Sequence, residues 1–167
     1  MIDLPKTKYC HLDINDDWLT ISLDNDKKKN ALSATLIDEI IKVLKNAGQS
    51  TQIRGILIKG KNRIFCSGAD LEELHQITYA KENREGLTTR MSIRIGNLLQ
   101  TISNVPQITA SVVDGPCIAG GFGIACATDI MITMDSSIFK LSETQLGLTP
   151  AQIAPYILNR VNYSQAR

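Results

Sequence analysis

Along most of this chain, short apolar runs typical of buried strands alternate with segments of helical periodicity. Trp18 to Leu23 (WLTISL) and Ile53 to Lys59 (IRGILIK) are rich in aliphatic and β-branched residues and predict strands. Between them, Ser33 is a candidate helix N-cap, and the apolar residues that follow it recur at helical spacing. Strands that alternate with helices are typical of an α/β fold with a mainly parallel sheet.

The same alternation continues toward the end of the sequence. Further elements are predicted as a helix from Thr88 to Ser103, a strand from Ile108 to Val113, a small-residue helix from Phe122 to Thr128, a strand from Ile130 to Thr133 and a last helix after Thr149. That last helix should carry Ile153, Ile157 and Val161, with Pro150 in its first turn. A length of 167 residues suits one domain, which we expect to span residues 1–167.

Composition argues against several classes of function. The 18 basic and 17 acidic residues nearly cancel, so we expect no nucleic-acid partner. No apolar run approaches the ~20 residues that span a bilayer, and no secretory signal is evident, so we expect no membrane and a cytoplasmic location. The four cysteines are scattered and are expected to be reduced thiols, with no metal site. No strand is followed by GxGxxG or by a P-loop, which argues against a dinucleotide-binding fold.

Two glycine-bearing turns each follow a predicted strand and precede a helix. They are Ser67-Gly68-Ala69-Asp70 and Ile118-Ala119-Gly120-Gly121. Each leaves free backbone N–H groups near a helix N-terminus, so two such turns that face one another could bind a single oxygen as an oxyanion hole. Either turn alone is more often plain architecture, and Asp70 has a structural alternative as the N-cap of the next helix.

Four motifs in this order resemble the enoyl-CoA hydratase/isomerase, or crotonase, superfamily. They are KKKNALS, IFCSGADLEEL, ITASVVDGPCIAGGFGIACATDIMI and FKLSETQLGLTP. The resemblance covers roughly Leu19 to Arg167 and implies an α/β crotonase-type spiral of ββα units. Members normally continue into a helical tail that helps to build trimers. The chain therefore looks truncated at its C-terminus, and a homotrimer or dimer of trimers would be expected of a full-length protein.

The resemblance implies an acyl-CoA thioester as substrate, with no cofactor besides the coenzyme A that is part of it. The N–H groups of Ala69 and Gly120 match the oxyanion hole of the family. Positions that match its coenzyme A site, with Leu71 the weaker assignment, are Lys27, Lys28, Lys29, Asn30, Ala31, Ser67, Gly68, Asp70 and Leu71. Lysines suit a ligand with several phosphates, although a solvated charge run is an equal alternative for these three.

The acidic residues decide which reaction is expected. Many hydratases of the family use two glutamates, of which the second matches Glu143 and the first falls at Gly123. Glu143 could be the principal acid/base, with a pKa raised by apolar neighbours. Another part of the protein could supply the missing group, or the site could bind acyl-CoA without turnover. The expected activity is hydration of a 2-enoyl-CoA, with double-bond isomerisation by a single glutamate and non-catalytic binding as alternatives.

The acyl group is predicted less sharply. The segments GGFGIACATD and LSETQLGLTPAQIAPYIL are similar to a bacterial subgroup described as methylglutaconyl-CoA hydratases of leucine degradation. A carboxylated acyl group would call for a cation, and Arg84, Arg90 and Arg94 are equal candidates that could also face solvent. Without the tail, we expect apolar surface near Ile153 to Val161 to be exposed.

Overall fold

The structure, a computed structural model, describes residues 3–80 and 82–166. Its main sheet has five strands in the order β1-β2-β3-β4-β6. Four of them are parallel, and β1 pairs antiparallel with β2. The strands are β1 (Cys10–Asn15), β2 (Trp18–Leu23), β3 (Gly55–Gly60), β4 (Ile108–Val113) and β6 (Ile130–Thr133). This arrangement confirms the predicted α/β class with a mainly parallel sheet.

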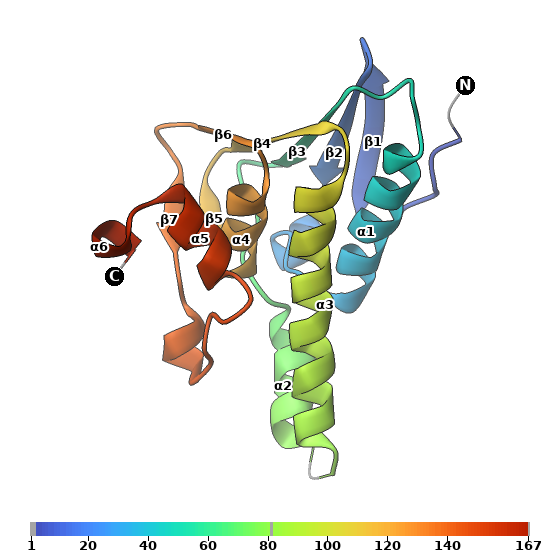
Figure 1. Cartoon of the computed structure of the whole chain (residues 1–167). Coiled ribbons are helices and arrows are strands. Elements are labelled where there is room, and N and C mark those ends of the chain that lie inside the picture. Colours follow the sequence, from blue (N-terminus) through green and yellow to red (C-terminus); the bar gives the residue numbers. More distant parts are fainter. Residues whose placement is uncertain (1–2, 81, 167) are drawn as a thin grey trace.

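Three helices cover one face of this sheet (Figure 1). They are α1 (Ala34–Gly48), α3 (Arg84–Asn104) and α4 (Gly120–Ala127). Their apolar faces meet the inward side chains of β2 and β3 in one hydrophobic core. The side chains that lose almost all solvent contact there are Leu19, Ile21, Leu23, Leu36, Ile40, Leu44, Ile56, Ile58, Leu98, Leu99 and Ile102. Burial of each such side chain favours folding by about 1.5–3 kcal/mol before entropy is counted.

The helix boundaries follow from local chemistry. Ser33 caps α1, because its hydroxyl accepts a hydrogen bond from the N–H of Leu36. Asp70 caps α2 (Leu71–Tyr79) by accepting from the N–H groups of Glu72 and Glu73. Helix α3 ends at Asn104 with Val105 as its C-cap, just before Pro106, as the sequence predicts. Figure 1 shows α2 beside the N-terminal half of α3, and together they project away from the sheet.

A second, two-stranded sheet lies on the same side as the helices. Its strands β5 (Pro116–Ile118) and β7 (Ile138–Lys140) are parallel. Cys66 extends this small sheet through an isolated parallel bridge to Cys117. Two 3-10 helices are also present: η1 (Asp26–Lys28) lies between β2 and α1, and η2 (Glu143–Leu146) follows β7. After η2 the chain forms α5 (Ala154–Arg160) and α6 (Tyr163–Ala166).

Two predictions about the last helical segment need correction. Pro150 does not lie in the first turn of the last helix, because α5 begins at Ala154 with Pro155 in that place. Ile153 and Ile157 are buried against the core, so the apolar surface expected there is largely covered; Leu158 nevertheless remains 45% exposed.

Among the helices of the described residues, none combines the length and the apolar character needed to cross a membrane.

Candidate active site

Three chain segments run parallel and in register beneath the main sheet, and each leads into a predicted site residue. Cys66 pairs with Cys117, and Cys117 pairs with Phe139. Ala69 and Gly120 each lie three residues beyond their paired cysteine, and Glu143 lies four residues beyond Phe139. Parallel segments in register bring the residues that follow them to one edge. The fold therefore brings these three sequence-distant positions to the same end of the small sheet.

The two glycine-bearing turns are in direct contact. The carbonyl of Cys66 accepts a hydrogen bond from the N–H of Ile118 at 2.9 Å. A Cβ added to Gly121 would lie 2.6 Å from the Cβ of Cys66, and one added to Gly68 would lie 3.1 Å from the Cβ of Ala119. Gly68 also has a φ of 93°, in the left-handed region that favours glycine. Both glycines thus permit an approach of the two turns that a side chain would obstruct.

Among residues 3–80 and 82–166, the N–H groups of Ala69 and Gly120 have no hydrogen-bond partner. In the part of the chain that the structure describes, no carbonyl or side chain accepts a hydrogen bond from either group. Gly120 is the first residue of α4, where helical N–H groups have no partner within the helix. Neither N–H group is used by the backbone hydrogen bonds of the described residues, and the start of α4 adds the partial positive charge of a helix N-terminus.

Glu143 begins η2 and is half-buried. Its Oε2 atom is shielded from solvent and has no hydrogen-bond partner among the described residues. Burial raises the pKa of the carboxyl, and this outweighs the opposing effect of nearby backbone N–H groups of Glu143 and Ser142. Burial thus favours the protonated form of this carboxyl more than solvent would, as in many groups that exchange protons in active sites.

Gly123 faces a filled space rather than an empty one. A Cβ added to Gly123 would lie 2.5 Å from Cγ2 of Ile153 and 3.3 Å from Cδ1 of Leu99. Gln152 packs against Gly96 of α3 in the same way, because a Cβ added to Gly96 would lie 2.5 Å from Oε1 of Gln152. The segment that follows η2 is thus seated between α3 and α4 by two helical glycines. In the structure, no second carboxylate could occupy position 123 without displacing Ile153.

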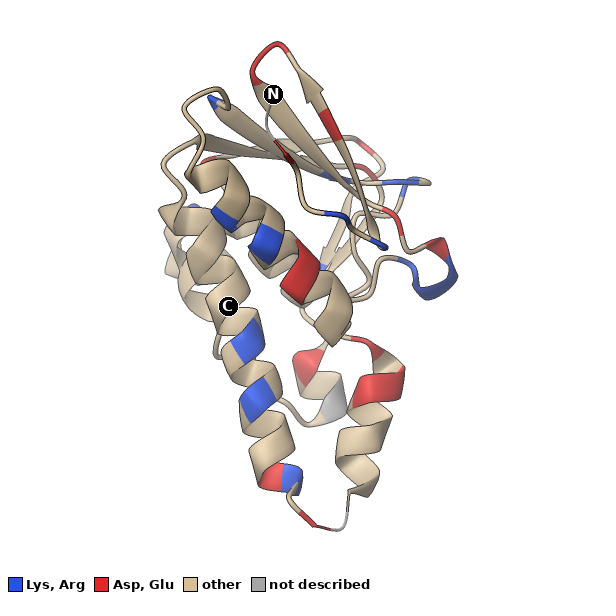
Figure 2. Cartoon of the chain, turned by 90° about the vertical axis from the view of Figure 1, so that its right-hand side faces the viewer, with Lys and Arg blue, Asp and Glu red and all other residues tan. Residues whose placement is uncertain are grey.

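The three lysines of the KKK run differ sharply from one another. Lys28 Nζ lies 2.7 Å from Oδ2 of Asp70 and 2.6 Å from Oε2 of Glu72. Lys27 and Lys29 are exposed. The two carboxylates raise the pKa of Lys28, Asp70 more than Glu72. Figure 2 shows this loop at the right of the molecule, where acidic and basic residues lie close together.

The remaining predicted ligand contacts lie around the first turn. Ser67 donates its N–H to Lys29 O at 3.1 Å, and its hydroxyl to Lys28 O at 3.3 Å. Asn30 and Ala31 are buried, whereas the Leu71 side chain is 69% exposed. The turn that holds Ser67, Gly68 and Asp70 thus packs against the loop of Lys28 and Lys29, while Leu71 is exposed to solvent. Their contacts with coenzyme A stay predictions.

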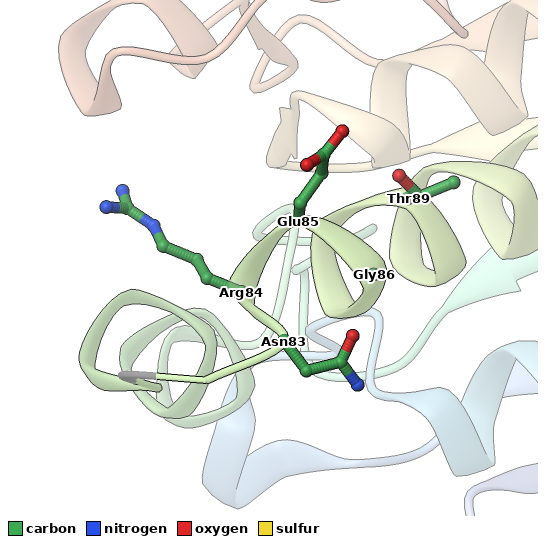
Figure 3. A pocket seen from close by; sticks show the side chains of 5 residues that line it. All are labelled: Asn83, Arg84, Glu85, Gly86 and Thr89. Atoms are coloured by element: carbon green, nitrogen blue, oxygen red, sulfur yellow. The ribbon is translucent and has the colours of Figure 1, made fainter.

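The three candidate arginines are spread along α3, where Figure 2 shows basic residues at intervals on its surface. Arg94 Nε lies 3.1 Å from Oδ1 of Asp38 on α1, and Arg90 donates weakly to Gly86 O at 3.4 Å. Arg84 lines an open hollow of about 490 Å³ at the start of α3 with Asn83, Glu85, Gly86 and Thr89 (Figure 3). None of these five lining residues belongs to the two turns, so the hollow is distinct from the predicted site.

The four cysteines are free and buried. Burial raises the pKa of Cys10 and Cys66 to about 12 and that of Cys126 to about 11, and it raises the pKa of Cys117 strongly as well. Among residues 3–80 and 82–166, no group of three or more His, Cys, Asp and Glu side chains is placed to hold a metal ion.

Two contributors near the site had no signal in the sequence. Ile153 fills the space beside Gly123, and Arg160 donates hydrogen bonds to the carbonyls of Cys126, Thr128 and Asp129 at the C-terminal end of α4. Both act from the last helical segment, 30 or more residues away in the chain from their partners. Only the packed structure pairs them with α4.

A family model described as enoyl-CoA hydratase/isomerase matches residues 13–167. Among curated proteins, the chain is similar to the enoyl-CoA hydratase AFT6-1 of Alternaria alternata, with 32% identity over 148 residues that cover 88% of this chain and 46% of the relative. It is also similar to the bacillaene synthase dehydratase PksH of Bacillus subtilis, with 32% identity over 146 residues, 87% of this chain and 54% of the relative. The chain spans about half the length of these two relatives.

Solved structures share this fold. AtuE of Pseudomonas aeruginosa superposes with a TM-score of 0.87 and 31% identity, covering 96% of this chain and 61% of that chain. An enoyl-CoA hydratase of Shewanella pealeana superposes with a TM-score of 0.89 and 28% identity, covering 97% and 60%. The fold of this chain is therefore one that longer proteins also contain.

Proposed function

Because this chain belongs to the enoyl-CoA hydratase/isomerase family, we propose that it binds an acyl-CoA thioester and stabilises the enolate that forms from it. The observation that carries the proposal is the pair of unbonded N–H groups, Ala69 and Gly120, on two turns in contact. In this proposal both donate to the thioester oxygen as it gains negative charge. One such donor typically contributes about 3 kcal/mol of transition-state stabilisation.

Glu143 is the proton carrier of the proposed reaction. Its buried, unpartnered Oε2 and raised pKa suit a group that takes up and releases a proton within one turnover. In hydration of a 2-enoyl-CoA, a water molecule adds its hydroxyl group at Cβ and its remaining proton reaches Cα through Glu143, while the two N–H groups hold the intermediate enolate. Coenzyme A enters as part of the substrate. Relatives described as enoyl-CoA hydratases support this reaction as the leading assignment.

Isomerisation is a second candidate, and the packing at Gly123 favours it. Ile153 and Leu99 occupy the space in which a second glutamate would hold water. Moving a double bond from the 3 to the 2 position needs no added water, because one carboxylate can remove a proton from Cα and return it to Cγ. A single Glu143 is sufficient for that shuttle.

A panel of thioesters separates these candidates. The chain is incubated with 2-enoyl-CoA and 3-enoyl-CoA substrates, including a carboxylated one of the methylglutaconyl type. The products are separated by chromatography and their masses are measured by mass spectrometry. Hydration adds the mass of one water, whereas isomerisation leaves the mass unchanged.

We expect Glu143→Gln to lower kcat by about 100-fold or more, because the amide cannot carry the proton, while acyl-CoA still binds. Glu85→Gln is the matched control, since Glu85 is an exposed glutamate on α3 outside both turns. If Glu143→Gln keeps the wild-type rate, Glu143 is not the proton carrier. If neither the wild type nor any variant binds or converts a thioester, the proposed function is wrong.

A further inference from the structure

The loop that contains η1 holds the first turn of the site by backbone hydrogen bonds. The N–H of Ser67 donates to Lys29 O at 3.1 Å, and the hydroxyl of Ser67 donates to Lys28 O at 3.3 Å. On the other side, Leu32 donates its N–H to Gly68 O at 2.7 Å. Residues 67 and 68 are therefore tied to residues 28–32, and the next N–H along the turn, that of Ala69, is the one left free.

An ion pair completes this connection immediately after Ala69. The ammonium of Lys28 contacts Asp70 Oδ2 at 2.7 Å, and the side chain of Asp70 is only 2% exposed. Burial on its own would raise the pKa of Asp70, but the Lys28 ammonium and the N–H groups of Glu73 and Glu72 together hold it below its usual range. Asp70 is thus an ionised, buried group whose position is set by a charged partner and by the start of α2.

We propose that Lys28 is a positioning residue, which holds Asp70 and thereby aims the N–H of Ala69 at the thioester oxygen. This inference rests on the proposed function of Ala69 as an oxyanion donor. It differs from the role that the sequence predicts for Lys28, which is contact with a coenzyme A phosphate.

The neighbouring lysines provide the contrast. Lys27 and Lys29 are exposed, and they take no part in the ion pairs found among the described residues. Their ammonium groups are free to meet a phosphate without breaking a contact. That of Lys28 would have to leave two carboxylates, one of them buried.

The test compares two thioesters of the same acyl group. One is the coenzyme A ester, and the other is the N-acetylcysteamine ester, which retains the thioester but lacks the nucleotide and every phosphate. We expect Lys28→Gln to lower kcat by about 10-fold or more on both esters, because a small displacement of a catalytic donor is costly whatever the rest of the substrate. Lys28→Arg, which keeps the charge, should recover most of that loss.

Lys61→Gln is the matched control, because Lys61 also forms an ion pair, with Asp24, and lies outside both turns. It should leave kcat and KM unchanged on both esters. A Lys28→Gln variant that raises KM for the coenzyme A ester alone, with kcat unchanged, would overturn the inference and make Lys28 a phosphate ligand.

A double-variant cycle isolates the contact with Asp70. If Lys28 acts through Asp70, then Lys28→Gln should have little further effect on kcat in an Asp70→Asn background. Effects that simply multiply in the double variant contradict this pathway. Circular dichroism and thermal unfolding of each variant identify any that fail to fold.

A measurement that needs no turnover keeps this inference separate from the proposed function. The backbone amide of Ala69 in ¹⁵N-labelled chain should change its chemical shift in Lys28→Gln and not in Lys27→Gln or Lys29→Gln. An Ala69 amide that does not respond to Lys28→Gln overturns the positioning role. If the wild-type chain converts no thioester but Lys28→Gln still changes the chemical shift of the Ala69 amide, the proposed function is refuted and the structural link between Lys28 and Ala69 stands.

Discussion

At the scale of single residues, the proposed role of Glu143 needs an ionised carboxyl, whereas stability favours the neutral one. Burial of a carboxyl favours its neutral form, so the folded chain raises the pKa of Glu143 above that of an unfolded chain. A group of this kind contributes its full stability below the unfolded pKa of about 4.3, and this contribution is lost as the pH rises through the folded pKa. The ionised form needed to accept a proton is thus the less stable one.

We therefore predict that Glu143→Gln raises the melting temperature at pH 8 while it removes activity. The amide resembles the neutral carboxyl and has no ionised form to bury. Thermal unfolding of the two proteins should converge at pH 4, where the wild-type glutamate is largely protonated. An equal difference at both pH values, or a Glu143→Gln variant that is less stable at pH 8, would contradict the origin assigned to the raised pKa.

Gly123 shows what residue-level reasoning could and could not supply. The resemblance to the family implies that Gly123 stands where many hydratases have a glutamate, and this stays a prediction. What fills the adjacent space depends on Ile153, which arrives from a later segment. Similarly, the KKK run suggests three equivalent phosphate contacts, yet only the folded chain distinguishes Lys28 by placing two carboxylates beside it. Contacts between distant segments carry no local signal.

At the scale of elements, α4 connects the site to the end of the described chain. Its first residue, Gly120, supplies a proposed oxyanion donor, and its C-terminal end is capped by the guanidinium of Arg160 from α5. Arg160 donates at 3.1 Å to each of the carbonyls of Cys126 and Asp129, and it also donates to Thr128 O. A cation at a helix C-terminus satisfies free carbonyls and complements the helix dipole.

Replacing Arg160 should therefore destabilise the chain as a whole. We predict that Arg160→Leu lowers the free energy of unfolding by about 1–2 kcal/mol, because several charge-assisted hydrogen bonds are lost at one helix end. Arg90→Leu is the matched control, since Arg90 makes one weak contact of 3.4 Å within its own helix and should change stability little. Chemical denaturation of both variants measures the difference, and equal losses would show that the cap contributes nothing.

The predicted elements succeeded where hydrophobic pattern alone decides. Strands β2, β4 and β6 were placed at their observed bounds, since each is a compact apolar run with β-branched residues. Strand β1 alternates polar and apolar residues near an exposed edge and was missed, as were β5 and β7, which have three residues each. Helix α3 begins at Arg84, one turn before the predicted start. The sequence did not predict this turn because Arg84 and Glu85 are polar and exposed, so no apolar pattern marks it. These segments adopt their structure through contacts with distant parts of the chain, and their own residues carry no clear pattern.

At the scale of the whole molecule, the site depends on three parallel segments that the fold aligns beneath the main sheet. The sequence predicted that two turns could face one another, but not that Cys66, Cys117 and Phe139 would pair in register. Two of these paired residues are cysteines within the core, and Cys10 and Cys126 extend the set to β1 and α4. The reactivity of the four thiols therefore reports whether the core around them is packed.

This distribution predicts the chemical behaviour of the thiols. A thiol reacts through its thiolate, and with pKa values of about 11 or higher the four buried thiols hold almost none at pH 8. We expect an aromatic disulfide reagent to modify the native chain very slowly and to titrate four thiols once denaturant is added. Because the four lie in one hydrophobic core, their reactivity should appear together at the denaturant concentration where circular dichroism reports unfolding. Rapid modification of any one thiol in the native chain would mean that its part of the core opens independently, and the alignment that brings Ala69 and Gly120 together would then be dynamic rather than permanent.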